Sequence, residues 1–164
     1  MRQGVRDENN DAVCVPSIET LSYSVIGSKR IFLKTIDNVG QMEIAKASIL
    51  VADDEESLRA GLSSVLENAG YEVTIARDGD EAMAAVRAKR FDLALLDIKM
   101  PKADGLQVLR FIKEKVPGTR VMMLTGYADL RHAIEPKKNG ADDFMGKPYE
   151  IEDLLATIRR LLDR

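Results

Sequence analysis

The chain has little of several residue types on which whole classes of protein depend. It has one cysteine, Cys14, which cannot form a disulfide within the chain, and one histidine, His132, which has no companion for a metal site and is expected at the surface. No long apolar run or signal-peptide pattern opens the chain, which excludes a membrane protein and makes the cytoplasm the expected location. Basic residues do not outnumber acidic ones, 24 against 27, so direct nucleic-acid binding is not expected.

From Ala47 onward, short apolar runs alternate with amphipathic segments. A composition of 45% hydrophobic and 31% charged residues is ordinary for a globular protein, and 164 residues suffice for one compact domain with an extension. The apolar runs predict strands at 48–52, 72–76, 92–97, 120–124 and 143–147, and the amphipathic segments predict helices at 55–69, 79–89, 104–115, from 129, and at 150–162. Five such units predict an α/β fold in which helices cover both faces of one parallel sheet.

Polar side chains stand where four of the predicted strands end. Asp53 and Asp54 follow the first strand, Asp97 ends the third, Thr125 follows the fourth, and Lys147 ends the fifth. An acid after one strand is most often a helix cap or a loop residue. Because the carboxyl ends of parallel strands meet at one edge of the sheet, five such residues together instead predict a site there.

The chemistry of this set favours phosphoryl transfer. Three neighbouring carboxylates repel one another, and their hard oxygen ligands suit Mg²⁺, which keeps an open side for phosphate oxygens. A lysine supplies a positive charge and a hydroxyl supplies a hydrogen-bond donor for the phosphoryl group. One carboxylate can itself be the nucleophile and form an acyl phosphate.

Four segments closely resemble the receiver domain of bacterial two-component response regulators: "ILVADDEES", "DLALLDIKMPKADGLQVL", "VMMLTGYADL" and "GADDFMGKP". The resemblance runs from about Ala47 to the end of the chain. It implies a doubly wound (βα)5, flavodoxin-like fold with strand order 2-1-3-4-5, as in chemotaxis regulators. It further implies a phosphorelay protein that is not an enzyme in the usual sense, although it assists its own phosphorylation and slow dephosphorylation.

The resemblance also implies a role for each site residue. Asp97 would accept a phosphoryl group from a phosphohistidine on a sensor histidine kinase or a phosphotransfer protein. Mg²⁺ would be held by Asp53, Asp54, Asp97 and the backbone carbonyl of Lys99. Lys147 would neutralise the phosphoryl group.

Thr125 would contact the phosphoryl group after activation, and Phe144 matches the aromatic that rotates together with this hydroxyl. Lys147-Pro148 matches the position of a cis peptide bond in the family. The surface formed by the fourth helix, fifth strand and fifth helix would change on phosphorylation and control a protein partner. Within the fourth predicted helix, Pro136 removes an amide donor, so this helix is expected to be short or kinked.

Residues 1–46 carry no recognisable motif and are expected to be an N-terminal extension that is either poorly ordered or a hairpin around Gly27-Ser28, while 47–164 form the receiver domain. A switch without its own output domain is favoured because the chain ends at Arg164, directly after the last helix. The alternative is the isolated receiver part of a longer transcription regulator. A haloacid-dehalogenase-type hydrolase is disfavoured, because Lys99 stands where that class has a second acid.

Overall fold

The computed structural model describes residues 23–26, 29–36, 42–44, 46–126 and 140–163. Four features predicted from the sequence lie outside these ranges: the fourth helix from Asp129, the position of Pro136 within it, the surface placement of His132, and the turn at Gly27-Ser28. None of the helices in the described part of the chain is long and apolar enough to cross a membrane.

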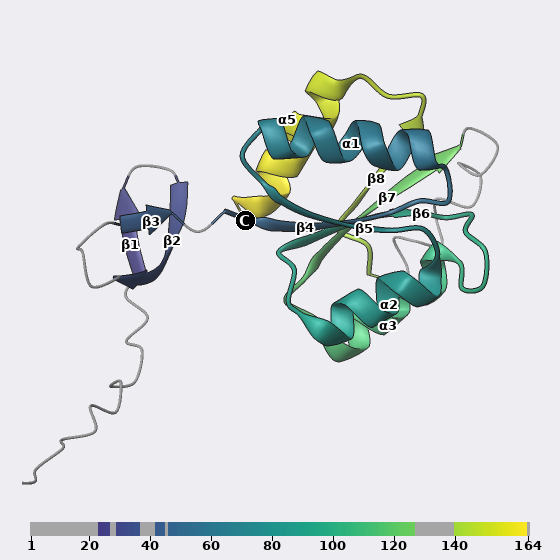
Figure 1. Cartoon of the computed structure of the whole chain (residues 1–164), viewed down its shortest axis with the longest axis horizontal. Helices are drawn as coiled ribbons and strands as arrows, with labels where there is room; N and C mark the ends of the chain where they lie inside the picture. Colours follow the sequence, from purple (N-terminus) through teal and green to yellow (C-terminus); the bar gives the residue numbers. More distant parts are fainter. Residues whose placement is uncertain (1–22, 27–28, 37–41, 45, 127–139, 164) are drawn as a thin grey trace, which may run out of the picture.

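Five parallel strands form the central sheet (Figure 1). They are β4 (Ser48–Ala52), β5 (Glu72–Ala76), β6 (Leu93–Asp97), β7 (Arg120–Gly126) and β8 (Asp143–Lys147). Their spatial order is β5-β4-β6-β7-β8, which is the predicted order 2-1-3-4-5 when the strands of this sheet are counted along the chain. The central strand β6 is buried at all five positions, whereas the edge strand β5 leaves Ile75 53% exposed. The predicted fold is confirmed.

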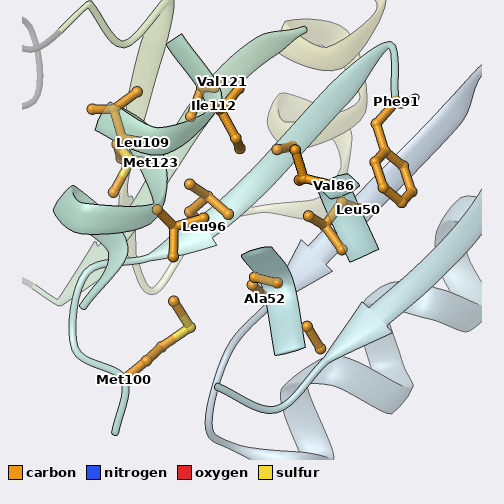
Figure 2. Close-up of a cluster of buried hydrophobic side chains, with 14 residues drawn as sticks. Leu50, Ala52, Val86, Phe91, Leu96, Met100, Leu109, Ile112, Val121 and Met123 are labelled. Carbon is orange, nitrogen blue, oxygen red and sulfur yellow. The ribbon is translucent and has the colours of Figure 1, made fainter. Parts of the chain in front are cut away.

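Helices cover both faces of this sheet, as Figure 1 shows: α1 (Glu56–Asn68) and α5 (Ile151–Leu162) on one side, α2 (Gly79–Ala88) and α3 (Gly105–Lys115) on the other. Each side has its own apolar cluster. Figure 2 shows the cluster on the α2 and α3 side, where Leu96 of β6 and Met123 of β7 lie near Leu109 of α3. Met100, from the loop after β6, extends this cluster toward the carboxyl edge of the sheet.

Side-chain caps fix where two of the helices begin. Asp104 accepts a hydrogen bond from the Gln107 amide at 2.7 Å, and the Gln107 side chain accepts one from the Asp104 amide at 3.1 Å. This reciprocal capping box starts α3 at the predicted residue. Asp78 caps α2 by accepting from the Glu81 amide at 2.9 Å. Both caps lie in loops that leave the carboxyl ends of strands, so they help to shape that edge.

The N-terminal part forms a second, three-stranded antiparallel sheet. Its strands are β1 (Tyr23–Ile26), β2 (Lys29–Ile36) and β3 (Met42–Ile44). β1 and β2 pair in an antiparallel register that runs from Tyr23 opposite Phe32 to Ile26 opposite Lys29. No strand of this sheet pairs with a strand of the five-stranded sheet among the residues that the structure describes.

Candidate functional site

Three of the predicted site residues meet at the carboxyl edge of the five-stranded sheet. Asp53 follows β4 and is 1% exposed, and Asp97 ends β6 and is 7% exposed. Lys147 ends β8, and its Nζ lies 2.5 Å from Asp53 Oδ2 and 2.9 Å from Asp97 Oδ1. One ammonium group therefore bridges two buried carboxylates that are 44 residues apart in the sequence.

Burial and this shared cation set the pKa values at the site. Burial lowers the pKa of Lys147, but the hydrogen bonds to Asp53 and Asp97 outweigh it and leave the pKa above its usual value. Burial raises the pKa of Asp97, and the hydrogen bond from Lys147 does not fully offset it. The two directions agree with the geometry, because Lys147 pairs with two carboxylates while Asp97 shares Lys147 with Asp53. The pKa of Asp97 is thus raised, and a further cation beside its carboxylate would stabilise the ionised form.

Backbone amides fix the orientation of both buried carboxylates. The Glu55 amide donates to Asp53 Oδ1 at 2.9 Å, and the Lys99 amide donates to Asp97 Oδ2 at 2.9 Å. Each carboxylate therefore has one oxygen bound to Lys147 and the other bound to the loop that follows it. Amide donors of this kind hold a carboxylate in one rotamer, which is the preorganisation that a nucleophile or a metal ligand requires.

The other predicted residues lie outside this ion-pair group. Asp54 is exposed and has no hydrogen bond or ion pair to the part of the chain that the structure describes. Thr125 is 1% exposed, and the only contact of its hydroxyl within the described part of the chain is a long 3.4 Å one to the Gly126 carbonyl. Phe144 is 40% exposed, so it is not an ordinary core residue. The peptide bond between Lys147 and Pro148 is cis, as expected.

The oxygen donors at this edge suit a hard cation such as Mg²⁺. Asp53 and Asp97 are buried carboxylates whose other neighbours are amides, and Asp54 adds an exposed carboxylate next to Asp53. Among the described residues, the structure has no group of three acidic, histidine or cysteine side chains arranged to hold a metal ion. Lys147 lies between the two buried carboxylates instead, so a cation at this edge would be added beside the lysine.

Two residues that support the site were not predicted. Arg59 of α1 donates from Nη1 to the Asp53 carbonyl at 2.7 Å and so ties the helix to the end of β4. Gly105, the first residue of α3, lies against the end of β6: a Cβ there would stand 2.0 Å from the Asp97 carbonyl oxygen. The Asp104-Gly105 pair at the start of the third predicted helix was the only sequence signal for this close approach, since a glycine is favoured where backbones meet.

Comparisons with known proteins point to one family of domains. The family model of the response regulator receiver domain matches residues 49–159. A probable transcriptional regulator, ycf27, of Cyanophora paradoxa is 42% identical over 123 residues, which are 75% of this chain and 51% of that protein. The transcriptional regulatory protein ZraR of Escherichia coli strain K12 is 38% identical over 114 residues, 70% of this chain and 26% of that protein. The chain therefore spans about half or about a quarter of the length of these curated relatives.

Solved structures show the same fold. A response regulator receiver domain protein (CheY-like) from Methanospirillum hungatei JF-1 has a TM-score of 0.70 at 36% identity, covering 73% of this chain and 95% of that chain. The chemotaxis protein CheY4 of Vibrio cholerae has a TM-score of 0.67 at 35% identity, covering 71% of this chain and 99% of that chain. In both cases nearly the whole of the other chain is matched by the part of this chain that carries the five-stranded sheet.

Proposed function

Because the chain belongs to the family of response regulator receiver domains, which are phosphoacceptor signalling domains rather than classical enzymes, we propose that Asp97 is its phosphoacceptor. The observation that carries this proposal is the bridge from Lys147 to Asp53 and Asp97. Asp97 itself is buried and oriented by the Lys99 amide, and burial keeps its pKa raised despite the hydrogen bond from Lys147, which suits a nucleophile. Membership of the family implies a histidine kinase as the phosphoryl donor.

In the proposed step, an Asp97 carboxylate oxygen forms a bond to phosphorus while the phosphorus–nitrogen bond of a phosphohistidine breaks. The electron pair of that bond leaves with the imidazole, and the product is an acyl phosphate on Asp97. Lys147 is already within hydrogen-bond distance of Asp97 and can follow the negative charge onto the phosphoryl oxygens. The domain thereby assists its own phosphorylation, and slow hydrolysis of the acyl phosphate would reset it.

Receiver domains generally use Mg²⁺ at the phosphorylation site. Here we assign the metal to Asp53, Asp54, Asp97 and the backbone carbonyl of Lys99. The bound ion would neutralise charge on the phosphoryl oxygens. Asp54 is suited to this role because its carboxylate is exposed and not engaged in an ion pair with any described residue.

The signal would leave the domain through the surface formed by the predicted helix from Asp129, β8 and α5. Thr125 is buried, and its hydroxyl has no strong partner among the described residues, so it can turn to a phosphoryl group without breaking a good hydrogen bond. Phe144, on the same β7–β8 side of the sheet, is half exposed and can move inward behind it. This change would control binding of a protein partner.

A second proposal concerns the protein to which this receiver domain belongs. The curated relatives named above are transcriptional regulators of which this chain spans half or less, so the chain also fits the receiver part of a longer transcription regulator. On either reading we assign residues 47–164 to the receiver domain and 1–46 to an N-terminal extension. Contact with nucleic acid would then belong to a separate output domain, because this chain carries a net charge of −3.

Incubation with acetyl phosphate and Mg²⁺, followed by intact-mass measurement, tests the phosphoacceptor. The wild-type protein should gain the mass of one phosphoryl group, and Asp97→Asn should gain none. Asp104→Asn is the matched control, because asparagine keeps the cap of α3 and the residue lies outside the ion-pair group. A full mass gain in Asp97→Asn would show that another residue is the acceptor.

A further inference from the structure

The loop that follows Asp97, residues 98–104, is attached to the N-terminal end of α2. Lys102 Nζ lies 2.8 Å from Asp78 Oδ2. The Asp78 carboxylate is buried, whereas the Lys102 side chain is 54% exposed. Arg77 is a weaker second partner, since its Nε is 4.0 Å from Asp78 and 2.7 Å from Glu81. The loop after the proposed phosphoacceptor is therefore joined by a charged pair to an element that carries no proposed site residue.

Backbone packing reinforces this attachment. A Cβ placed on Gly79, the first residue of α2, would lie 2.0 Å from the Ala103 carbonyl oxygen and 2.6 Å from the Ala103 Cβ. The start of the helix and the loop are thus in direct contact at a position where only glycine fits. Met100, in the same loop, is buried in the apolar cluster beneath α2 and α3. The loop is therefore anchored at two points: Met100 is buried in the apolar core, and Lys102 and Ala103 contact the start of α2.

Lys102 itself has a backbone conformation that needs support. Its φ is 66°, in the left-handed region that residues other than glycine rarely adopt. An ion pair to a buried carboxylate offsets this cost by fixing the side chain. The pKa of Asp78 is lowered and that of Lys102 is raised, and the hydrogen bond between them is the first cause in each case. Loss of the pair should therefore loosen the loop at Lys102.

The loop in question also orients Asp97. The Lys99 amide donates to Asp97 Oδ2 at 2.9 Å, and the Gly105 amide closes the loop by donating to the Ile98 carbonyl at 3.0 Å. Lys102 lies between these two hydrogen bonds in the sequence. From this geometry we infer that Asp78 and Lys102 are positioning residues, which hold the loop so that the Lys99 amide keeps the Asp97 carboxylate in its reactive orientation.

Asp78 has a second task, and the two can be separated. Its Oδ1 accepts from the Glu81 amide and caps α2, whereas its Oδ2 binds Lys102. Asp78→Asn keeps a good cap and removes the charge. Lys102→Ala removes the same ion pair from the other side without touching the cap. If the pair positions the loop, these two variants should behave alike and the double variant should be no worse than either one.

The first measurement is amide hydrogen exchange of the unphosphorylated protein, which does not depend on the proposed reaction. The amides of Lys99 and Gly105 should exchange about twofold to fivefold faster in Asp78→Asn and Lys102→Ala, the range expected for loss of a partly exposed ion pair. Lys102→Arg should restore the wild-type rates. Lys89→Ala is the matched control, because Lys89 forms a 2.6 Å pair with Glu72 at the other end of α2. Unchanged exchange in both variants would overturn the inference.

The second measurement, which rests on the proposed function, is the rate of phosphorylation by acetyl phosphate with Mg²⁺ in excess. Both variants should be slower by about twofold to fivefold, and the control should match the wild type. Faster exchange with an unchanged phosphorylation rate would refute the positioning role and leave only a structural one. If the wild-type protein took up no phosphoryl group, the proposed function would fail, while the exchange rates would still decide whether the pair holds the loop.

Discussion

Lys147 Nζ lies 2.9 Å from Asp97 Oδ1, although β6 and β8 are not neighbours and β7 runs between them. The same ammonium group is 2.5 Å from Oδ2 of Asp53, which directly follows β4 on the far side of β6. The lysine therefore reaches across the carboxyl edge of the sheet and links β8 to the ends of β6 and β4, neither of which pairs with β8. With two carboxylates for one ammonium group, the cluster has a surplus negative charge that a bound cation would balance.

Removal of this lysine should make the protein more dependent on Mg²⁺. In Lys147→Ala, Asp53 and Asp97 remain buried without a counter-charge, so the free energy of unfolding should fall by about 2 to 4 kcal/mol without metal. Added Mg²⁺ should recover part of this loss, because binding to the folded state stabilises it. Urea unfolding with and without Mg²⁺ measures both quantities. Lys115→Ala, an exposed lysine paired with Glu114, is the control, and an equal Mg²⁺ effect in both variants would contradict the prediction.

The meeting of Asp53, Asp97 and Lys147 could be predicted from the sequence, because unbroken apolar runs identified the strands and parallel strands place their carboxyl ends at one edge. The amphipathic pattern predicted the third helix from Asp104, and this residue caps α3. These features follow from periodicity and from short local motifs. They do not depend on the conformation of any loop.

The pair between Asp78 and Lys102 could not be predicted in this way. It depends on a left-handed conformation at Lys102 and on a helix start 24 residues earlier in the sequence, and neither leaves a pattern in the sequence. The exposure of Ile75 was missed for a different reason. An edge strand of a parallel sheet can have the same apolar composition as a central one, so composition alone does not indicate which strand is covered.

Asp54→Ala should strongly weaken Mg²⁺ binding and phosphorylation without destabilising the fold. Asp54 is exposed and has no ion pair to any described residue, so its removal should change the free energy of unfolding by less than about 0.5 kcal/mol. Loss of one of the few protein ligands should weaken Mg²⁺ binding by at least about tenfold. Calorimetric titration measures the affinity, and Glu56→Ala, an exposed acid two residues away, is the control. Wild-type affinity in Asp54→Ala would show that the ligand assignment is wrong.

The ionised Asp142 carboxylate should stabilise the protein at neutral pH, and this contribution should be lost in acid. Burial alone would raise its pKa, but hydrogen bonds from Lys113 at 2.6 Å, the Val121 amide at 2.8 Å and Arg120 at 2.9 Å outweigh burial and lower the pKa below 3.8. A carboxylate whose pKa is lowered on folding stabilises the protein fully above its unfolded pKa, and this contribution is lost as the pH falls through the folded pKa. Stability should therefore decrease below about pH 4.

Asp142→Asn tests this dependence. At pH 7 the variant should lose about 1 to 3 kcal/mol, because two charged hydrogen bonds are weakened while the amide of Val121 keeps an acceptor. At pH 2 to 3 the difference from the wild type should shrink, since Asp142 is then becoming protonated in both the folded and unfolded states. Urea unfolding at the two pH values gives the comparison, with Asp80→Asn as an exposed control in α2. A difference that does not change with pH would mean that the charge of Asp142 is not what stabilises this region.

Two glycines at helical positions should respond in opposite directions to the same substitution. Gly61 lies in the interior of α1, and no other element of the described chain comes within 4 Å of where an alanine Cβ would stand. Gly61→Ala should therefore raise the free energy of unfolding by about 0.5 to 1 kcal/mol through helix propensity. Gly105 begins α3, where a Cβ would stand 2.0 Å from the Asp97 carbonyl oxygen and 3.1 Å from the Ile98 Cα. These obstacles are backbone atoms and cannot rotate away.

Gly105→Ala should therefore displace the end of β6 from α3 and lower the free energy of unfolding by about 1 to 3 kcal/mol, the usual cost of overpacking. The displacement would reach Asp97 directly, because the obstructing oxygen belongs to that residue. Phosphorylation by acetyl phosphate should slow by at least about tenfold, since small misplacements of a nucleophile are costly. Gly61→Ala should keep the wild-type rate. A folded Gly105→Ala protein that reacts as fast as Gly61→Ala would show that the position of the Asp97 backbone does not limit the reaction.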